Sequence, residues 1–248
     1  MDRLIDVART AMRGSMARQT AIANNLANTE TAGFRAEIVN ASTRWLGGQN
    51  TFQSRAEQVG QVIAADMKQG TVTQTGNPLD VAVDGDAMIA VQANDGSEGY
   101  TRRGDLKLNE SGLLTTGDGS PVIGEAGPIT LPPADSIKIG KDGGIWIVPP
   151  GGQIDQPQLV DTIKLVNAKG SVIAKGTDNL FREVNGGALP QDPLASVTSG
   201  ALEGSNVNAT VALVQMIEAS RSWETQIKMI DTAKDIDSGG ASLMRLDG

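Results

Sequence analysis

The stretch Ile22-Ala-Asn-Asn-Leu-Ala-Asn-Thr-Glu-Thr-Ala-Gly-Phe-Arg35 decides the fold of this chain. It predicts the end of an amphipathic helix, because Ile22 and Leu26 continue an apolar stripe. Gly33 allows a positive φ angle that turns the chain, and Phe34 supplies an apolar anchor after the turn. Short amides bond nearby backbone and favour helix ends, which makes a polar C-terminal cap the simplest explanation of three asparagines: Asn24, Asn25 and Asn28.

The composition excludes several classes of site and partner. The 248 residues, enough for one large domain or two smaller ones, include no cysteine and no histidine. Disulfides, thiol chemistry, His-dependent triads, zinc–histidine sites and histidine pH switches are therefore ruled out. Three Trp, one Tyr and three Phe predict an aliphatic core. The net charge of −8 argues against nucleic acid or an anionic membrane as partner.

The sequence predicts neither a membrane span nor a cleaved signal peptide. No apolar run approaches the roughly 18 residues of a spanning helix. Charged residues interrupt any apolar signal segment near the N-terminus, namely Asp2, Arg3, Asp6, Arg9 and Arg13. If the protein leaves the cytoplasm, we expect it to use another route.

Proline marks the organisation of the chain. All ten prolines lie between Pro78 and Pro193, and helices exclude proline whereas turn-rich β folds use it. This pattern predicts an α+β chain with terminal helices and an all-β middle, a sandwich or irregular barrel of short strands joined by Gly, Asn and Asp turns. The expected parts are an N-terminal helix at 1–34, a linker at 35–71, a β-rich domain at 72–203 and a C-terminal helix at 204–248.

Both terminal helices show heptad spacing. The N-terminal helix, expected at 2–26, has its seam at Ile5, Ala8, Met12, Ser15, Gln19, Ile22 and Leu26. The C-terminal helix, expected at 206–237 with Ser205 and Asn206 as its cap, has its seam at Leu213, Met216, Ser220, Trp223, Ile227 and Ile230, with Ile217 beside it. Each seam is too narrow and too polar to form a core alone. We therefore expect the two helices to pair as a coiled coil, and then to pair with other chains.

Two assemblies are compatible with such ends. Self-complementary ends that make head-to-tail contacts build rings or open helical tubes, which indicates a filament subunit. The alternative is a monomer in which both helices pack on the β domain.

Candidate chemical residues are better explained by turns. Aspartates stand beside or near glycines at irregular spacing, without the pattern of a calcium loop, at Asp84, Asp86, Asp95, Asp105, Asp118 and Asp142. Glu110 and Glu125 are a possible carboxylate pair, but the aromatic subsites expected for a sugar are missing. Arg102 and Arg103, beside Tyr100, could bind an anion, but a solvated strand end or a salt bridge between subunits explains them better. The sequence predicts no catalytic residue, no cofactor and no metal site.

Several motifs resemble those of one family. Ala23-Asn-Asn-Leu-Ala-Asn28, followed by Thr31-Ala-Gly-Phe34, resembles the N-terminal signature of bacterial flagellar axial proteins, the rod and hook subunits. Leu202-Glu-Gly-Ser-Asn-Val-Asn208 before an apolar helix is similar to the C-terminal signature of that family. Gly96-Ser-Glu-Gly-Tyr-Thr-Arg-Arg-Gly-Asp105 and Pro121-Val-Ile-Gly-Glu-Ala-Gly-Pro128 are similar to proximal rod subunits in particular.

The resemblance implies a non-enzymatic subunit of the proximal rod, exported by the flagellar type III apparatus and assembled in the periplasmic part of the drive shaft to transmit torque. In this family the terminal helices form an inner coiled-coil layer, with the β domain outside. The implied partners are further copies and other rod or axial proteins, with no nucleic acid, small-molecule substrate or membrane insertion. The residues expected to position the helices are Ile22, Asn24, Asn25, Leu26, Asn28, Gly33, Phe34, Ser205, Asn206, Val207, Asn208, Met216, Trp223, Ile227 and Ile230.

Three alternatives remain at this point. Phe34-Arg-Ala-Glu-Ile38 is similar to the element by which early flagellar substrates engage the export gate, and an anchor under the linker explains it equally. Within the family, the chain could be a distal rod or hook subunit. In a different class, it could be a secreted β-domain hydrolase that uses Glu110 or Glu125.

Overall fold

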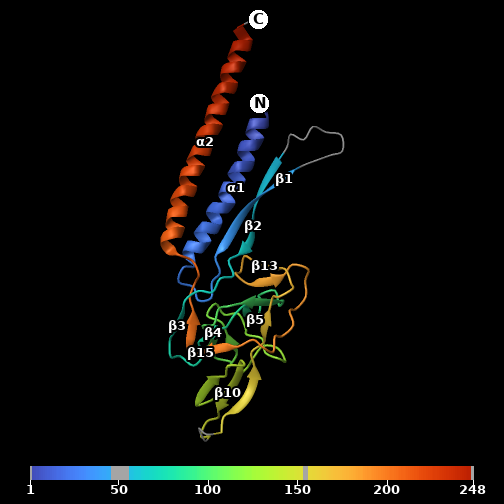
Figure 1. Cartoon of the computed structure of the whole chain (residues 1–248), viewed down its shortest axis with the longest axis vertical. Coiled ribbons are helices and arrows are strands. Elements are labelled where there is room, and N and C mark those ends of the chain that lie inside the picture. Colours follow the sequence, from blue (N-terminus) through green and yellow to red (C-terminus); the bar gives the residue numbers. More distant parts are fainter. Residues whose placement is uncertain (1, 46–55, 153–155, 247–248) are drawn as a thin grey trace. The chain divides into compact units, whose positions relative to one another are not determined.

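The computed structural model describes residues 2–45, 56–152 and 156–246 (Figure 1). Two long helices, α1 (Asp2–Ala27) and α2 (Ala209–Leu246), come from the two ends of the chain, and the part between them is mostly β structure. The chain divides into two compact units, and both are built from separate segments. The helical unit contains residues 1–27, 37–64 and 208–248, and the β unit contains residues 28–36 and 65–207.

In the helical unit, α1 contacts α2 and a β hairpin, and it lies between them in Figure 1. The hairpin pairs β1 (Glu37–Trp45) with β2 (Ala56–Ala65), whereas the sequence predicts a linker at 35–71 with at most a short helix or strand at 58–67. Polar residues and a glycine interrupt the apolar alternation of both strands, so the local pattern does not reveal them. The side chains of Ala21 and Ile22 on α1 are buried.

The predicted coiled coil between the terminal helices is wrong. The seam residues Leu213 and Ile227 of α2 are 51% and 40% exposed, whereas a coiled coil buries its seam. Among the described residues, the buried apolar ones on α2 are Ala212 and Ala219. The helix therefore buries small side chains and leaves larger aliphatic ones outside.

The ends of α2 also differ from expectation. Asn208, and not Ser205 or Asn206, caps the helix, since its Oδ1 accepts the N–H of Val211 at 3.1 Å. At the other end, α2 continues through Gly239 to Leu246, beyond the expected end at residue 237. A glycine inside a helix costs only about 1 kcal/mol relative to alanine, which is too little to end it.

Short antiparallel strands make up the β unit. Its largest sheet has the order β12-β5-β6-β14-β13, made of β5 (Ala87–Gln92), β6 (Glu98–Thr101), β12 (Leu165–Asn167), β13 (Ile173–Lys175) and β14 (Phe181–Glu183). A second sheet contains β9 (Ser136–Ile139), β10 (Gly144–Val148) and β11 (Gln158–Thr162). Two-stranded ladders join β3 (Val72–Gln74) to β16 (Ala201–Glu203), β4 (Val81–Val83) to β15 (Val197–Ser199), and β7 (Lys107–Leu108) to β8 (Leu114–Thr115). Small sheets thus take the place of the expected sandwich or barrel.

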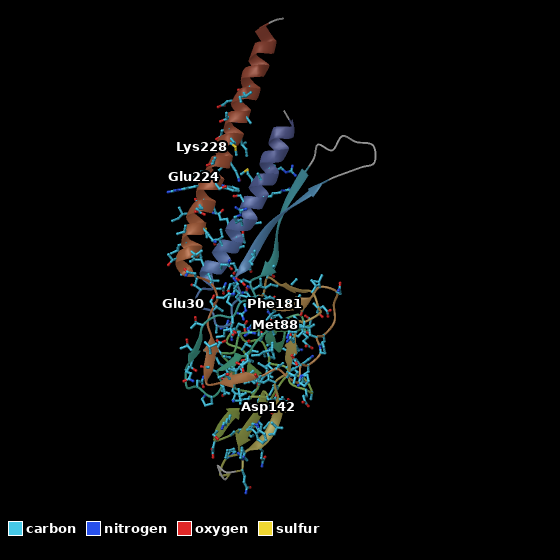
Figure 2. All side chains as sticks on the ribbon, in the orientation of Figure 1. Glu30, Met88, Asp142, Phe181, Glu224 and Lys228 are labelled. Carbon is cyan, nitrogen blue, oxygen red and sulfur yellow. The ribbon has the colours of Figure 1, made fainter. Side chains whose placement is uncertain are left out.

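Strand β5 lies at the centre of the β unit. All five residues from Ala87 to Val91 are buried, so the strand has apolar neighbours on both faces. Ile89 and Val91 join a large aliphatic cluster, and Met88 joins a second cluster that includes Phe181 (Figure 2). Neither described helix combines the length and the apolarity needed to cross a membrane.

The single tyrosine, Tyr100, lies in the second cluster, and we expect it to resist ionisation. Burial raises its pKa to about 12, although the N–H of Leu189 donates a hydrogen bond of 2.5 Å to the phenol oxygen. The folded pKa lies above the unfolded value of about 10, so this contribution to stability is complete below about pH 10 and is lost as pH rises towards 12. Titration of tyrosinate absorbance in the folded chain checks this, and a midpoint near that of free tyrosine would contradict the buried geometry.

Candidate functional site

A buried carboxylate binds two buried arginines inside the β unit. The side chain of Glu203, at the end of β16, is 0% exposed, and those of Arg35 and Arg102 are each 1% exposed. The Glu203 Oε2 atom accepts hydrogen bonds from Arg102 Nε at 2.8 Å and Nη2 at 2.6 Å. Its Oε1 atom accepts the Gly70 N–H at 2.8 Å and lies 2.5 Å from Arg35 Nη1. We call Arg35, Arg102 and Glu203 the Glu203 cluster.

Arg102 uses its whole guanidinium group. Besides the two bonds to Glu203, its Nη1 donates to the carbonyls of Gly85 and Ala87, and its Nη2 donates to that of Val83. These five bonds match the five donors of an arginine. The interpretation of Arg102 as a solvated strand end is therefore wrong, whereas Arg103 pairs with Asp105 at 2.7 Å at a partly exposed position.

Arg35 has fewer of its hydrogen-bond donors satisfied than Arg102. Within the described structure its Nε and Nη1 atoms have no well-formed hydrogen bond, although Nη1 is close enough to Glu203 for an ion pair. Burial lowers the pKa of Arg35, the charge of Glu203 opposes that shift, and the charge of Arg102 adds to it. Two guanidinium groups thus share one carboxylate in the interior, so the stability of the cluster depends on Glu203.

The turn after α1 brings Arg35 to this carboxylate. The Gly33 N–H donates to the backbone carbonyl of Glu203 at 2.7 Å, with φ of 66° at Gly33. A Cβ atom at Gly33 would collide with the backbone carbonyl of Arg102. Phe34 is buried, and the Nζ of Lys175 lies 3.5 Å from the centre of its ring and 3.0 Å from the Arg35 carbonyl oxygen.

Asn206 ties three segments of the β unit together. Its Oδ1 accepts the N–H of Ala36 at 2.7 Å, and its Nδ2 donates to the carbonyls of Asp66 and Lys68 at 2.7 and 2.9 Å. One amide thus joins the exit of α1, the end of the hairpin and the entry to α2. A serine or an alanine at this position could not make all three bonds.

The asparagines near the end of α1 make comparable links inside the helical unit. Asn25, which is 8% exposed, accepts the N–H of Glu37 at 2.7 Å and donates to its carbonyl at 3.0 Å. Asn24 donates to the Glu37 side chain at 2.5 Å. These side chains fix the start of β1, so they are more than the polar cap that the residues alone suggest.

The other predicted site residues have varied surroundings. Ile22 is buried; Leu26, Val207, Met216, Trp223 and Ile230 are half-buried; and Ile227 is exposed. Asn28 accepts a hydrogen bond from the Thr31 hydroxyl at 3.0 Å, and Ser205 Oγ accepts the N–H of Val207 at 3.2 Å. Both terminal motifs contribute to the β unit, through residues 28–36 and 203–206.

Arg35, Arg102 and Glu203 were not predicted to belong to one site. Their positions could have indicated two of them, because Arg35 directly follows the Gly33-Phe34 turn and Glu203 lies inside the C-terminal motif. Their pairing across the chain has no local pattern. Among the described residues, no group of three or more acidic, histidine or cysteine side chains could hold a metal ion, and Asp95 and Asp142 accept N–H groups of their own turns.

Replacing Glu203 by glutamine should strongly destabilise the β unit. Glu203→Gln leaves two buried guanidinium groups without their counter-charge, which costs about 3–5 kcal/mol of unfolding free energy. Glu98→Gln, which breaks the partly exposed ion pair with Lys164, is the matched control and should cost about 1 kcal/mol or less. Urea unfolding measures both values, and equal losses would contradict the role of the cluster.

Replacing Gly33 by alanine should cost more than the same change at another positive-φ glycine. Gly76, with φ of 75°, has open space around its Cβ position, so Gly76→Ala should lose about 1 kcal/mol from backbone strain alone. Gly33→Ala adds a collision with the Arg102 carbonyl. Thermal or urea unfolding compares the two variants, and indistinguishable stabilities would argue against the close approach.

Comparison with known proteins bears on the C-terminal motif and on the middle of the chain. Residues 198–243 match the family model "Flagellar basal body rod FlgEFG protein C-terminal", and residues 82–147 match "Flagellar hook protein FlgE/F/G D1 domain". The chain is 41% identical over 241 residues to the flagellar basal-body rod protein FlgF of Escherichia coli (strain K12), which covers 95% of each chain. It is 39% identical to FlgF of Salmonella typhimurium (98% of each chain) and 31% identical to FlgG of Bacillus subtilis (92% of this chain, 93% of FlgG). The chain therefore belongs to the flagellar basal-body rod protein family.

Proposed function

We propose that the chain is a structural subunit of the proximal part of the flagellar rod. The support is its similarity to FlgF from three organisms, at 41%, 39% and 33% identity. FlgG of Bacillus subtilis is 31% identical over a comparable share of the chain. The distal rod and hook subunits, the alternatives within the family, are therefore not favoured.

The Glu203 cluster is the observation that supports a torque-transmitting role in this proposal. The chain passes between its two units four times, after residues 27, 36, 64 and 207. Close to these passages, Ala36, Asp66 and Asn206 are hydrogen-bonded to one another, and Arg35 and Glu203 form a buried ion pair. Because these connecting segments are bonded to one another inside the β unit, they resist independent rotation. This property suits a subunit that transmits torque.

Assembly involves the terminal helices. Large apolar side chains remain exposed on the described part of α2, and most of them lie in its first half and near its middle: Val211, Leu213, Val214, Ile217, Ile227, Met229 and Ile236. Contiguous exposed apolar residues mark surfaces that bind other proteins. Further copies of the chain and other rod proteins are the partners that this surface suits.

The site of action in this proposal is the periplasmic rod, reached through the flagellar export apparatus. Phe34, in the element similar to an export-gate motif, is 4% exposed in the folded chain. The Phe34 side chain would therefore be accessible only in an unfolded chain. No catalytic role is proposed for Glu110 or Glu125, and the chain acts as a structural component.

We expect the chain in flagellar basal bodies purified from the source organism without hook and filament. Mass spectrometry should find peptides from residues 104–182 in that rod fraction.

Leu26→Asp, which places a charge on the half-buried face of α1, should remove the chain from the fraction and abolish swimming. Leu194→Asp is the matched control, because Leu194 is 90% exposed in the β unit.

The outcomes separate the alternatives. Recovery of the native chain in the hook instead of the rod would assign it to another axial subunit. Its absence from both fractions would refute a structural role in the flagellum. Normal swimming of the Leu26→Asp strain would show that α1 does not take part in assembly.

A further inference from the structure

A pocket of about 250 Å³ lies inside the β unit, next to the turn that follows α1. Its lining includes residues 31–35 of that turn and residues 178–181, which end the connection from β13 and begin β14. Both groups belong to the β unit, as do the other lining residues. We call this cavity the Asn179 pocket. It is formed within one compact unit from segments that are distant in sequence.

Part of the lining is apolar and buried. Phe34, Leu180 and Phe181 are each 4% exposed, and Phe181 is labelled in Figure 2. A water molecule occupies about 30 Å³ in the liquid, so the pocket has room for something much larger than one water. Apolar walls with a few polar groups are typical of sites for small organic molecules.

Two lining residues carry buried polar atoms that lack a partner. Within the described residues, no group accepts a hydrogen bond from the Nε donor of Arg35, and none donates to the Oδ1 acceptor of Asn179. Buried polar atoms are normally paired, and an unpaired one costs free energy. A bound molecule that has both an acceptor and a donor would satisfy both atoms.

The charged side chains of the lining restrict the kind of molecule that fits. Arg35, Arg103 and Lys175 are cationic, whereas Asp118 and Asp178 are anionic. A doubly charged anion such as phosphate would meet two carboxylates, and a purely cationic ligand would meet three basic groups, so like charges disfavour both. A ligand that combines a single negative charge with an N–H donor avoids both conflicts.

The conformation of Asn179 does not by itself account for its unpaired oxygen. Its φ angle of 63° is the only positive value at a described residue other than glycine, and its N–H donates to the Gly176 carbonyl at 3.1 Å. Glycine adopts this turn conformation without strain, and asparagine tolerates it better than most residues. Glycine would therefore serve the turn equally well and would leave no unpaired acceptor in the pocket.

We propose that the Asn179 pocket binds a carboxylate with a neighbouring N–H donor, the chemistry shared by a free amino acid and the C-terminus of a peptide. The carboxylate accepts from Arg35, the N–H donates to Asn179 Oδ1, and the carbon atoms between them lie against Phe34. The inference goes beyond the proposed function. A bound ligand would connect the turn after α1 to the start of β14 and would stabilise the folded β unit.

Calorimetric titration of the purified full chain with small probes tests this site. N-acetylglycine, which has a carboxylate and an amide N–H, and free glycine are the two ligands. At least one should give a saturable heat of binding, and the tighter one identifies the source as a peptide C-terminus or a free amino acid. Acetate lacks the N–H and N-acetylglycinamide lacks the carboxylate, so each should bind several-fold more weakly. Saturable binding of neither ligand, or equal binding of acetate, would overturn the proposal.

Asn179→Gly is the decisive variant, because glycine keeps the positive φ angle and removes only the unpaired acceptor. The variant should melt at the native temperature or above it, and it should bind the tighter ligand roughly five- to tenfold more weakly, the loss expected for one hydrogen bond. Asn185→Gly, at an exposed position outside the pocket, is the matched control and should keep the native affinity.

Undiminished binding by Asn179→Gly, or an equal loss in both variants, would overturn the proposal. The titrations use the isolated chain, so their outcome is independent of its place in the flagellum. Absence of the native chain from the rod fraction refutes the proposed function, whereas a failed titration refutes only the ligand site.

Discussion

The negative charge of the Glu203 carboxylate compensates the charges of two guanidinium groups in the interior of the β unit. The positions of the segments around the carboxylate depend on these ion pairs. Arg102 brings the loops after β4 and β6 together, and Arg35 brings in the exit of α1. Buried charges of this kind contribute little net stability when they are complete, but removal of one partner is costly. The cluster therefore favours one folded arrangement over others, because the carboxylate has all its partners only when residues distant in sequence meet in that arrangement.

Local sequence was sufficient to predict the coarse organisation of the chain. Proline distribution located the β-rich part, heptad spacing located both helices, and the positive φ at Gly33 followed from its place after the helix. The hairpin at 37–65 was missed, because its polar strands lack apolar alternation. The coiled coil was predicted wrongly, because spacing identifies a stripe on a helix without showing whether any partner covers it. Leu213 and Ile227 belong to such a stripe and remain exposed.

The site was only partly predictable for a related reason. Asn24 and Asn25 stood out as part of an unusual density of asparagines at a helix end, and Asn206 was expected to cap the C-terminal helix. All three make specific hydrogen bonds. Their partners are mostly backbone groups and therefore leave no trace in the sequence. Arg102 and Glu203 carry ordinary charged side chains next to strands, where an exposed position is the usual expectation. Only the three-dimensional pairing of β16 with β3 brings Glu203 into contact with Arg35 and Arg102.

The β unit is built from two separate segments of the chain, and the contacts between them can form only after both segments have appeared. Ala36 and Asn206 are bonded to each other across 170 positions, and Arg35 waits for Glu203 over a similar distance. A chain that emerges from its N-terminus, whether from a ribosome or from a narrow channel, therefore carries Arg35 and Ala36 without these two partners until residues 203–206 have emerged. The bonds of the first segment of the β unit are therefore completed only by the last segment of that unit to appear.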